Sequence, residues 1–216
     1  MKFLTEITVP TWVCLAASVV SLFLLKKLSL LDILATSVLW INLVVDLYAT
    51  YLVSLKQHTI FLYNLSIPLL GMIVLYVYFR SSPIKWLSTA YLIALAIVMM
   101  IWLIYSLYSG IRGQFNYIPY IVTAFLIAAG SYLLMRNMVL RSSLLPPVIL
   151  FFALANFAYY SLGMAAQYAE ILKGYLTEHQ SFVVKAYIND VGYVLSSVMI
   201  LTGIIWKHRQ SPTYSL

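Results

Sequence analysis

Seven long apolar runs follow one another along the chain, separated by short polar or basic breaks. Each run is about 20–27 residues long, which is the length that an α-helix needs to cross a bilayer with some tilt. The expected helices cover residues 7–25, 31–54, 60–80, 84–108, 117–136, 146–172 and 182–206. The pattern predicts an all-α fold, a polytopic transmembrane bundle of seven helices, as a single domain over residues 1–216.

The second expected helix, residues 31–54, carries polar side chains inside its apolar sequence. Asn42, Asp46 and Thr50 are spaced i, i+4, i+8, so they fall on one stripe of the helix. A carboxylate at this depth costs about 2.5–3.5 kcal/mol unless it faces the protein interior, water or a partner. The other helices must therefore cover this stripe, and Asp32 lies near the same stripe at the start of the helix.

Polar stripes also occur on the third, sixth and seventh expected helices, and the longest is on the sixth. Together they give the candidate residues of a ligand or proton site: Asp46, Asp190, Asn42, Asn64, Asn156, Tyr160, Gln167 and Tyr193. The structural interpretation, which suits Asn64 and Asn156 best, is that these polar residues hold the helices together by contacts between them. Intramembrane carboxylates instead favour a functional hypothesis. We therefore expect Asp46 and Asp190 to face one polar pocket.

Orientation follows from the distribution of Lys and Arg, since cytoplasmic loops carry more of them. One face of the bundle would hold eight of the 13, namely Lys26, Lys27, Arg80, Lys85, Arg136, Arg141, Lys207 and Arg209. The other face would hold Lys2, Lys56, Arg112, Lys173 and Lys185. This bias predicts the N-terminus outside and the C-terminus in the cytoplasm, which places Asp46 and Asp190 in the outer half of the membrane.

Composition agrees with a multi-pass protein of the cell membrane, the inner membrane in a Gram-negative cell. The chain is 63% hydrophobic and only 9% charged, against about 25% charged in soluble domains. Its net charge of +7 comes from single or paired basic residues at the ends of the apolar runs. That placement is typical of contacts with anionic lipid headgroups, so no nucleic-acid partner is expected.

The sequence offers no known catalytic, cofactor or metal-binding motif. Cys14 is the only cysteine, and His58, His179 and His208 lie in separate loops or the tail, so neither a thiolate cluster nor a His-rich metal site is expected. The rhodopsins also have seven helices, and the microbial ones carry a retinal-binding Lys one turn after an Asp in the last helix. Here Val194 follows Asp190 by four residues, so no covalent retinal is expected.

The chain resembles small bacterial seven-helix membrane proteins of unassigned function. The resemblance lies in Phe61-Leu62-Tyr63-Asn64, Pro146-Pro147, the run ANFAYYSLG at residues 155–163, and Ile188-Asn189. It covers nearly the whole chain and implies an architecture like the membrane half of some sensory proteins without an attached kinase. It implies no catalytic residues.

Three functions follow as hypotheses. The first is a non-enzymatic sensor or accessory protein whose outer-half pocket binds a small or lipidic ligand, or which packs against a partner membrane protein such as a kinase. The second is a small proton-coupled transporter that uses Asp46 and Asp190 and needs access from both sides. The third is a metal-dependent lipid hydrolase, which needs Glu170 to join the two aspartates around a divalent ion.

Overall fold

The computed structural model describes residues 7–110, 117–141, 146–171 and 178–210. Within these ranges the chain folds into helices joined by short connections. They are α2 (Val9–Leu24), the short 3-10 helix η1 (Leu25–Lys27), α3 (Leu30–Ser54), α4 (Ile60–Ser81), α5 (Lys85–Ser109), α6 (Tyr117–Arg141), α7 (Pro147–Ile171) and α8 (Glu178–Gln210). In this described part, seven helices are long and apolar enough to cross a membrane. The prediction of an all-helical, multi-pass membrane protein is confirmed.

The expected helix limits agree closely with the structure for the second to fourth spans and for the sixth, and fall short for the fifth and the seventh. α3 begins one residue before the expected start, whereas α6 continues to Arg141 and α8 covers Glu178–Gln210 instead of 182–206. The hydrophobic pattern reports the part of a helix that lies in hydrocarbon. Backbone hydrogen bonding continues beyond it into the polar interface, where Lys, His and Arg occupy the last turn of α8.

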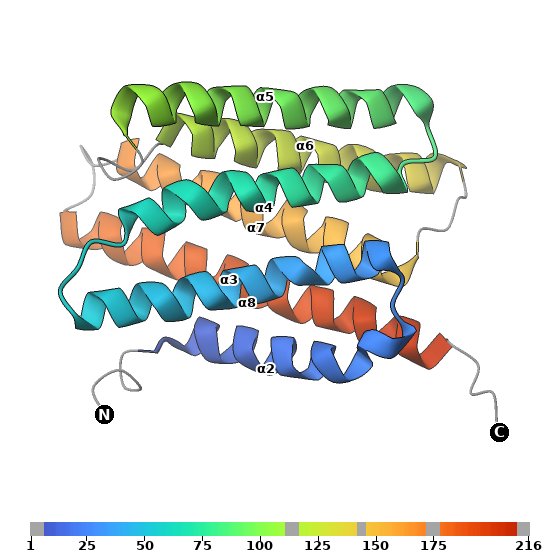
Figure 1. Cartoon of the computed structure of the whole chain (residues 1–216), viewed down its shortest axis with the longest axis horizontal. Coiled ribbons are helices and arrows are strands. Elements are labelled where there is room, and N and C mark those ends of the chain that lie inside the picture. Colours follow the sequence, from blue (N-terminus) through green and yellow to red (C-terminus); the bar gives the residue numbers. More distant parts are fainter. Residues whose placement is uncertain (1–6, 111–116, 142–145, 172–177, 211–216) are drawn as a thin grey trace.

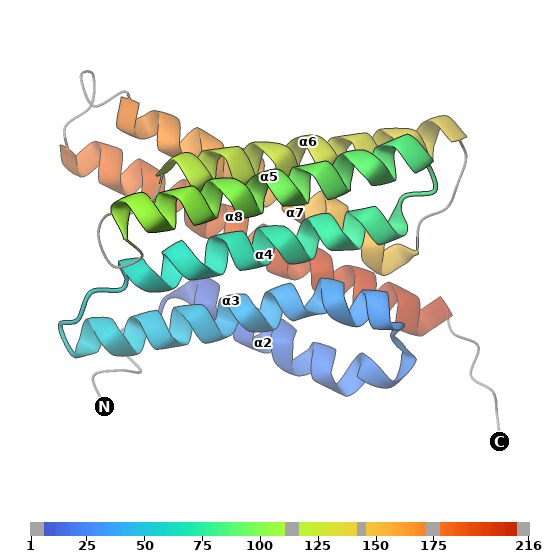
Figure 2. The ribbon, with the colours of Figure 1, turned by 45° about the horizontal axis from the view of Figure 1, so that its top comes forward.

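Six of the helices form a closed ring. α2 packs on α3, α3 on α4, α4 on α6, α6 on α7, α7 on α8, and α8 returns to α2. α5 lies outside this ring against α4 and α6. Figures 1 and 2 show the helices running along one common direction, with the start of α2 and the end of α8 at opposite ends of the bundle. A chain that passes along the bundle an odd number of times begins and ends at opposite ends of it.

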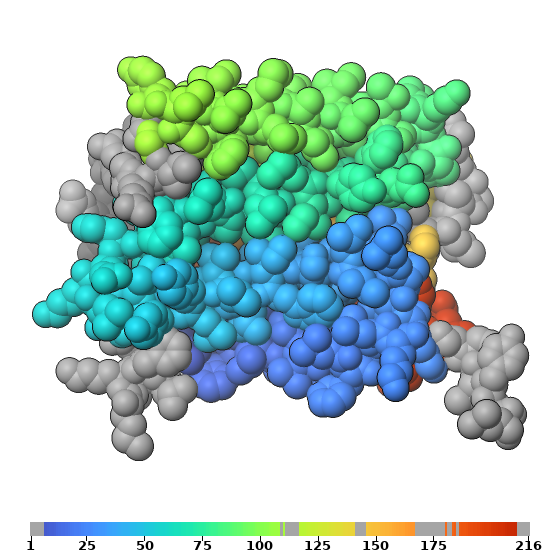
Figure 3. Space-filling view, in the orientation of Figure 1, coloured from blue at the N-terminus to red at the C-terminus, as the bar shows by residue number. Residues whose placement is uncertain are grey.

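The surface of the bundle is apolar along its length. α5 alone exposes Ile93, Met100, Ile104 and Leu107, each by more than half of its area, and Figure 3 shows α2–α5 forming one continuous face. Such a surface would be a large hydrophobic patch in water, but it is the expected outer surface of a protein embedded in lipid.

Side chains fill the half of the bundle that lies towards the C-terminus. The Tyr78 hydroxyl and Ser131 Oγ are hydrogen-bonded at 2.6 Å, and the Tyr91 hydroxyl donates to the Gly130 carbonyl at 2.8 Å. The Phe152 ring is fully buried and packs edge-on against Tyr78. Because polar groups here bond to one another and the rings interlock, this half forms a closed core.

Asp32 belongs to that closed half and not to the Asp46 region. Its carboxylate accepts a hydrogen bond from the Ser29 backbone N–H at 2.9 Å, which completes a capping box at the start of α3. The same oxygen, Oδ2, forms an ion pair with Lys207 near the end of α8. Asp32 precedes Asp46 by fourteen residues, or about 21 Å of helix. The two aspartates therefore lie at different ends of α3 and have different surroundings.

Candidate functional site

A pocket of about 560 Å³ lies inside the ring, in the half towards the N-terminus. Each of the six ring helices contributes residues to its lining. The residue just before α2, Thr8, also lines the pocket. The lining includes Thr8 and Thr11 at the start of α2, residues of the second half of α3, and the first turns of α4 and α6. The pocket is therefore a product of the ring and not of any single helix.

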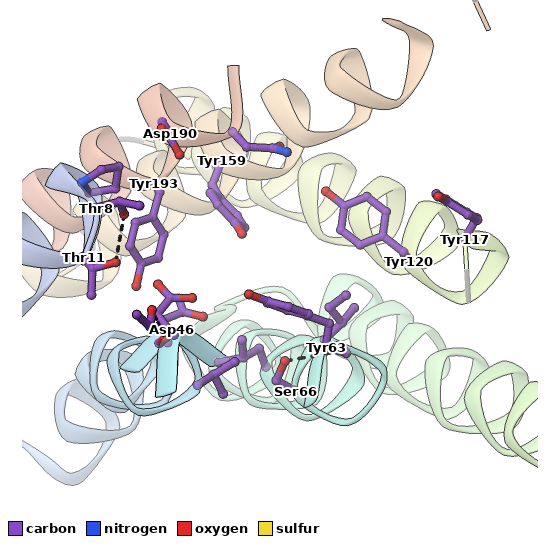
Figure 4. Close-up of a pocket in the computed structure, with 17 residues that line it drawn as sticks. Thr8, Thr11, Asp46, Tyr63, Ser66, Tyr117, Tyr120, Tyr159, Asp190 and Tyr193 are labelled. Atoms are coloured by element: carbon purple, nitrogen blue, oxygen red, sulfur yellow. Dashed lines mark hydrogen bonds between the residues drawn. The ribbon is translucent and has the colours of Figure 1, made fainter. Parts of the chain in front are cut away.

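Asp46 and Asp190 line this same pocket, from α3 and α8 respectively. Figure 4 shows both carboxyl groups on the pocket side of their helices. Asp46 is half-buried and Asp190 is exposed. α3 and α8 are not ring neighbours, since α2 lies between them on one side. The two aspartates thus face one cavity from helices that are not neighbours in the ring.

The α3 stripe also faces the pocket, as its spacing predicts. Asn42 and Thr50 both line it beside Asp46. The Thr50 hydroxyl donates to the Asp46 backbone carbonyl at 2.8 Å, so this hydroxyl is used within the helix. The carboxyl group of Asp46 is left to face the cavity.

Tyr193 completes the polar floor of the pocket. Its side chain is only 9% exposed, and its hydroxyl points across the cavity towards Asp46 (Figure 4). No described residue pairs with this hydroxyl in good hydrogen-bond geometry. A buried hydroxyl without a partner costs about 1–3 kcal/mol, so such a group in a cavity is a candidate contact for a ligand or water.

Tyrosines make up much of the remaining wall. Tyr63 of α4, Tyr117 and Tyr120 of α6, and Tyr159 of α7 line the pocket together with Tyr193. The Tyr159 and Tyr193 ring centroids are 6.4 Å apart. Neither Tyr63 nor Tyr159 was among the residues expected from the sequence. In one chain, a pocket tyrosine and a lipid-facing or core tyrosine give the same apolar signal.

Asn64 and Asn156 lie outside the pocket wall, each buried among its neighbours. Pro68 lacks an N–H, which frees the Asn64 backbone carbonyl four residues earlier, and Trp102 Nε1 of α5 donates to that carbonyl at 2.9 Å. The Asn156 amide donates to the Phe152 carbonyl at 2.8 Å within α7. Both positions therefore fit the interpretation as structural contacts.

The α7 stripe faces a different direction from the one expected. Tyr160 is buried behind the wall, where its ring meets Tyr159 edge-on at 5.1 Å, and Gly163 gives room for the Tyr120 hydroxyl. The stripe through Asn156, Tyr160 and Gly163 thus packs against neighbouring helices, and Tyr159 faces the pocket instead. The side chains of Gln167 and Glu170 lie outside the described residues.

The chemistry available in the pocket is acidic and aromatic. Among its described lining residues there are two carboxyl groups and no Lys, Arg or His. Across the described part of the chain, no three His, Cys, Asp or Glu side chains gather as a metal site would require. Two carboxylates, several tyrosine hydroxyls and the two amides of Asn42 and Asn189 are suited to binding a ligand by charge and hydrogen bonds.

The chain matches no family model, no curated protein and no solved structure. The described part of the chain has seven helices that are long and apolar enough to cross a membrane, which is consistent with the resemblance to small seven-helix membrane proteins. Conclusions about function must therefore come from the pocket itself.

Proposed function

We propose that this protein is a non-enzymatic sensor or accessory protein of the cell membrane that binds a small or lipidic ligand in the tyrosine-lined pocket. The observation that carries this proposal is the pocket itself. It gathers Asp46 and Asp190 from two non-neighbouring helices around the buried hydroxyl of Tyr193. Acidic groups inside a membrane bundle are retained where they have a use, and a cavity with a few convergent polar groups is the usual form of a binding site.

The closed half of the bundle favours a sensor over a carrier. A carrier has to offer its site to both faces of the membrane. Here the Tyr78–Ser131 and Tyr91–Gly130 hydrogen bonds and the buried Phe152 ring occupy the bundle beyond the pocket. A receptor needs only one opening. With the N-terminus outside, as the Lys and Arg bias indicates, that opening faces outwards.

The second candidate, a small proton-coupled transporter, draws its support from the shared position of Asp46 and Asp190. Two carboxyl groups facing one cavity could exchange protons as a substrate moves. This function requires the packed half to open. The lipid hydrolase receives less support, because the described pocket lining offers two carboxylates and no histidine for a divalent metal ion.

The sensor proposal also implies an output partner. As in the sensory proteins whose membrane half the chain resembles, we propose a partner membrane protein, such as a kinase, that contacts the lipid-facing helices. In this proposal α8, which runs from the pocket at Asp190 to Lys207 at the opposite end, carries the signal. A rigid helix that crosses the membrane is able to transmit a shift of one end to the other.

Thiol labelling from each face of the membrane separates the first two functions. Thr50 lines the pocket, and Cys14 is fully buried, so Thr50→Cys in a Cys14→Ala background places one reactive thiol in the cavity. We expect a membrane-impermeant maleimide to label this cysteine from the N-terminal face only. Right-side-out and inverted vesicles give the two measurements, and the Cys14→Ala protein without Thr50→Cys serves as the blank.

Labelling from both faces would contradict the sensor proposal and favour the transporter. Labelling in inverted vesicles alone would contradict the proposal that the pocket opens at the N-terminal face and that this face is outside. The absence of labelling in either kind of vesicle would show that the pocket is closed to solutes, which would overturn its role as a binding site.

A further inference from the structure

We propose that the ligand of this pocket is a protonated organic amine; this inference rests on the proposed function and names the class of ligand for the same site. Three features of the wall point to a cation with N–H donors and an organic body. They are its charge, its aromatic rings and the buried hydroxyl of Tyr193.

The charge of the wall favours a cation. Asp46 and Asp190 face the cavity from α3 and α8, which are not neighbours in the ring, and the described lining residues carry no basic side chain. A carboxylate at membrane depth is stabilised by an opposite charge beside it. A ligand with one ammonium group supplies that charge from within the cavity, where it can lie near Asp46. An anionic ligand would meet two like charges instead.

The rings of the wall favour an organic cation. Tyr63, Tyr159 and Tyr193 come from three different helices and surround the space in front of Asp46 (Figure 4). A cation within about 6 Å of an aromatic face is attracted by the ring quadrupole, and the attraction grows when water is excluded. Tyrosine rings also provide apolar area for the carbon skeleton of an amine. A bare metal ion would use neither property.

The Tyr193 hydroxyl favours an ammonium that still carries hydrogens. This hydroxyl is nine-tenths buried, makes no hydrogen bond of good geometry among the described residues, and points into the cavity beside the Asp46 carboxyl group, with which it interacts. Its oxygen can accept a hydrogen bond from an ammonium N–H while the Asp46 carboxylate accepts another. One ammonium group would then satisfy both polar groups at once. A quaternary ammonium could not donate to either.

The size of the cavity is compatible with such a ligand. At about 560 Å³ it falls within the range of roughly 300–1,000 Å³ that is typical of small-molecule sites. A space of this volume exceeds the needs of an ammonium head group alone. The tyrosine-lined remainder, towards Tyr117 and Tyr120, is therefore available for an apolar or aromatic body.

A matched set of three probes tests the charge of the ligand. Benzylammonium, benzyl alcohol and benzoate share one ring and differ in charge. Binding would be measured by ligand-observed NMR titration against the full chain in nanodiscs of phosphatidylcholine, whose zwitterionic surface does not concentrate cations. We expect saturable binding of benzylammonium, with both other probes weaker by about tenfold or more.

Variants locate that binding. Asp46→Asn is expected to weaken benzylammonium by about tenfold or more, since a charge-assisted hydrogen bond is lost. Tyr193→Phe should weaken it by a few-fold, to about the extent of one hydrogen bond. The matched control is Tyr91→Phe, which removes a buried hydroxyl outside the pocket and should leave the affinity unchanged.

Each other outcome has a distinct meaning. Equal or tighter binding of benzyl alcohol or benzoate would overturn the amine inference while leaving a ligand-binding pocket in place. Benzylammonium binding that survives Asp46→Asn would also overturn it, because the cation would then lie elsewhere. Failure of all three probes to bind overturns the amine inference as well. The proposed function is then judged by the two-face labelling of Thr50→Cys, which uses no ligand.

Discussion

A chain that carries Lys207→Met is expected to lose about 3 kcal/mol of stability. Lys207 pairs with Asp32, whose side chain is only 1% exposed, and removing one partner of a buried ion pair costs roughly 3–5 kcal/mol because the other charge stays buried. The lower end of that range applies because the Lys207 side chain is 24% exposed and Asp32 keeps its bonds to Ser29. Thermal or denaturant unfolding in neutral detergent measures the loss.

Two further variants separate the ion pair from a general effect of charge. Arg209→Met removes a positive charge from the same last turn of α8, at an exposed position, and should change stability by less than about 0.5 kcal/mol. The double variant Asp32→Asn with Lys207→Met removes both charges and should recover part of the loss. If Lys207→Met and Arg209→Met behave alike, the pair does not stabilise the bundle.

Gly203→Ala is expected to destabilise the contact between α7 and α8 by about 1–3 kcal/mol, which is typical of overpacking. A Cβ atom at Gly203 would lie 2.8 Å from Phe151 Cβ, and 3.1 Å from both the Pro147 carbonyl oxygen and Val148 Cα. Backbone atoms cannot rotate aside, so the two helices must separate. Unfolding of the purified variant, compared with the unchanged chain, measures this effect.

Gly192→Ala is the matched control on the same helix. Its Cβ would have ordinary contacts of 3.5–3.6 Å with Leu162 and Tyr159, and Ala is a better helix former than Gly by up to about 1 kcal/mol. We expect Gly192→Ala to be neutral or stabilising. Equal losses for the two substitutions would mean that α8 is not held against α7 at Gly203 as described.

The fold could be predicted from the sequence because hydrocarbon imposes one rule on every span. Backbone groups in lipid must bond within the segment, so each long apolar run has to be a helix. α3, for example, ends at Ser54, as expected. The ring order could not be predicted, because the lipid-facing and core faces of these helices are both apolar and give no signal of which helix lies beside which.

The candidate site could be predicted in part, and the successes and failures have one cause. Asn42, Asp46, Asp190 and Tyr193 reach the pocket because a charge or a polar stripe in an apolar helix needs an interior to face. Asn64 and Asn156 look the same in sequence, but neither lines the pocket: the Asn64 backbone carbonyl accepts from Trp102 Nε1 of α5, and the Asn156 amide donates to the Phe152 carbonyl of its own helix. Helical spacing predicts on which face of its helix a residue lies. Only the packing of the helices decides whether that face contacts another helix, lipid or the cavity.

Tyrosine is where the sequence carried least information. Tyr159 and Tyr160 are neighbours in the chain, yet Tyr159 lines the pocket and Tyr160 is buried behind it. Tyr63 faces the cavity and Asn64 does not, which reverses the order that polarity alone predicts. An amphipathic ring fits a core, a membrane interface or a binding site equally well, so its role emerges only when six helices close around a space.

The central claim is that Asp46 and Asp190 face one cavity that is open to solutes. Its most direct test is the rate at which the cysteine of the Thr50→Cys, Cys14→Ala protein reacts with a cationic and an anionic methanethiosulfonate of similar size. Two carboxylates that line the same cavity as the thiol should make the cationic reagent faster by about tenfold or more. The ratio should fall markedly when Asp46→Asn or Asp190→Asn is added. Equal rates for the two reagents, or a ratio that neither substitution changes, would contradict the shared acidic pocket.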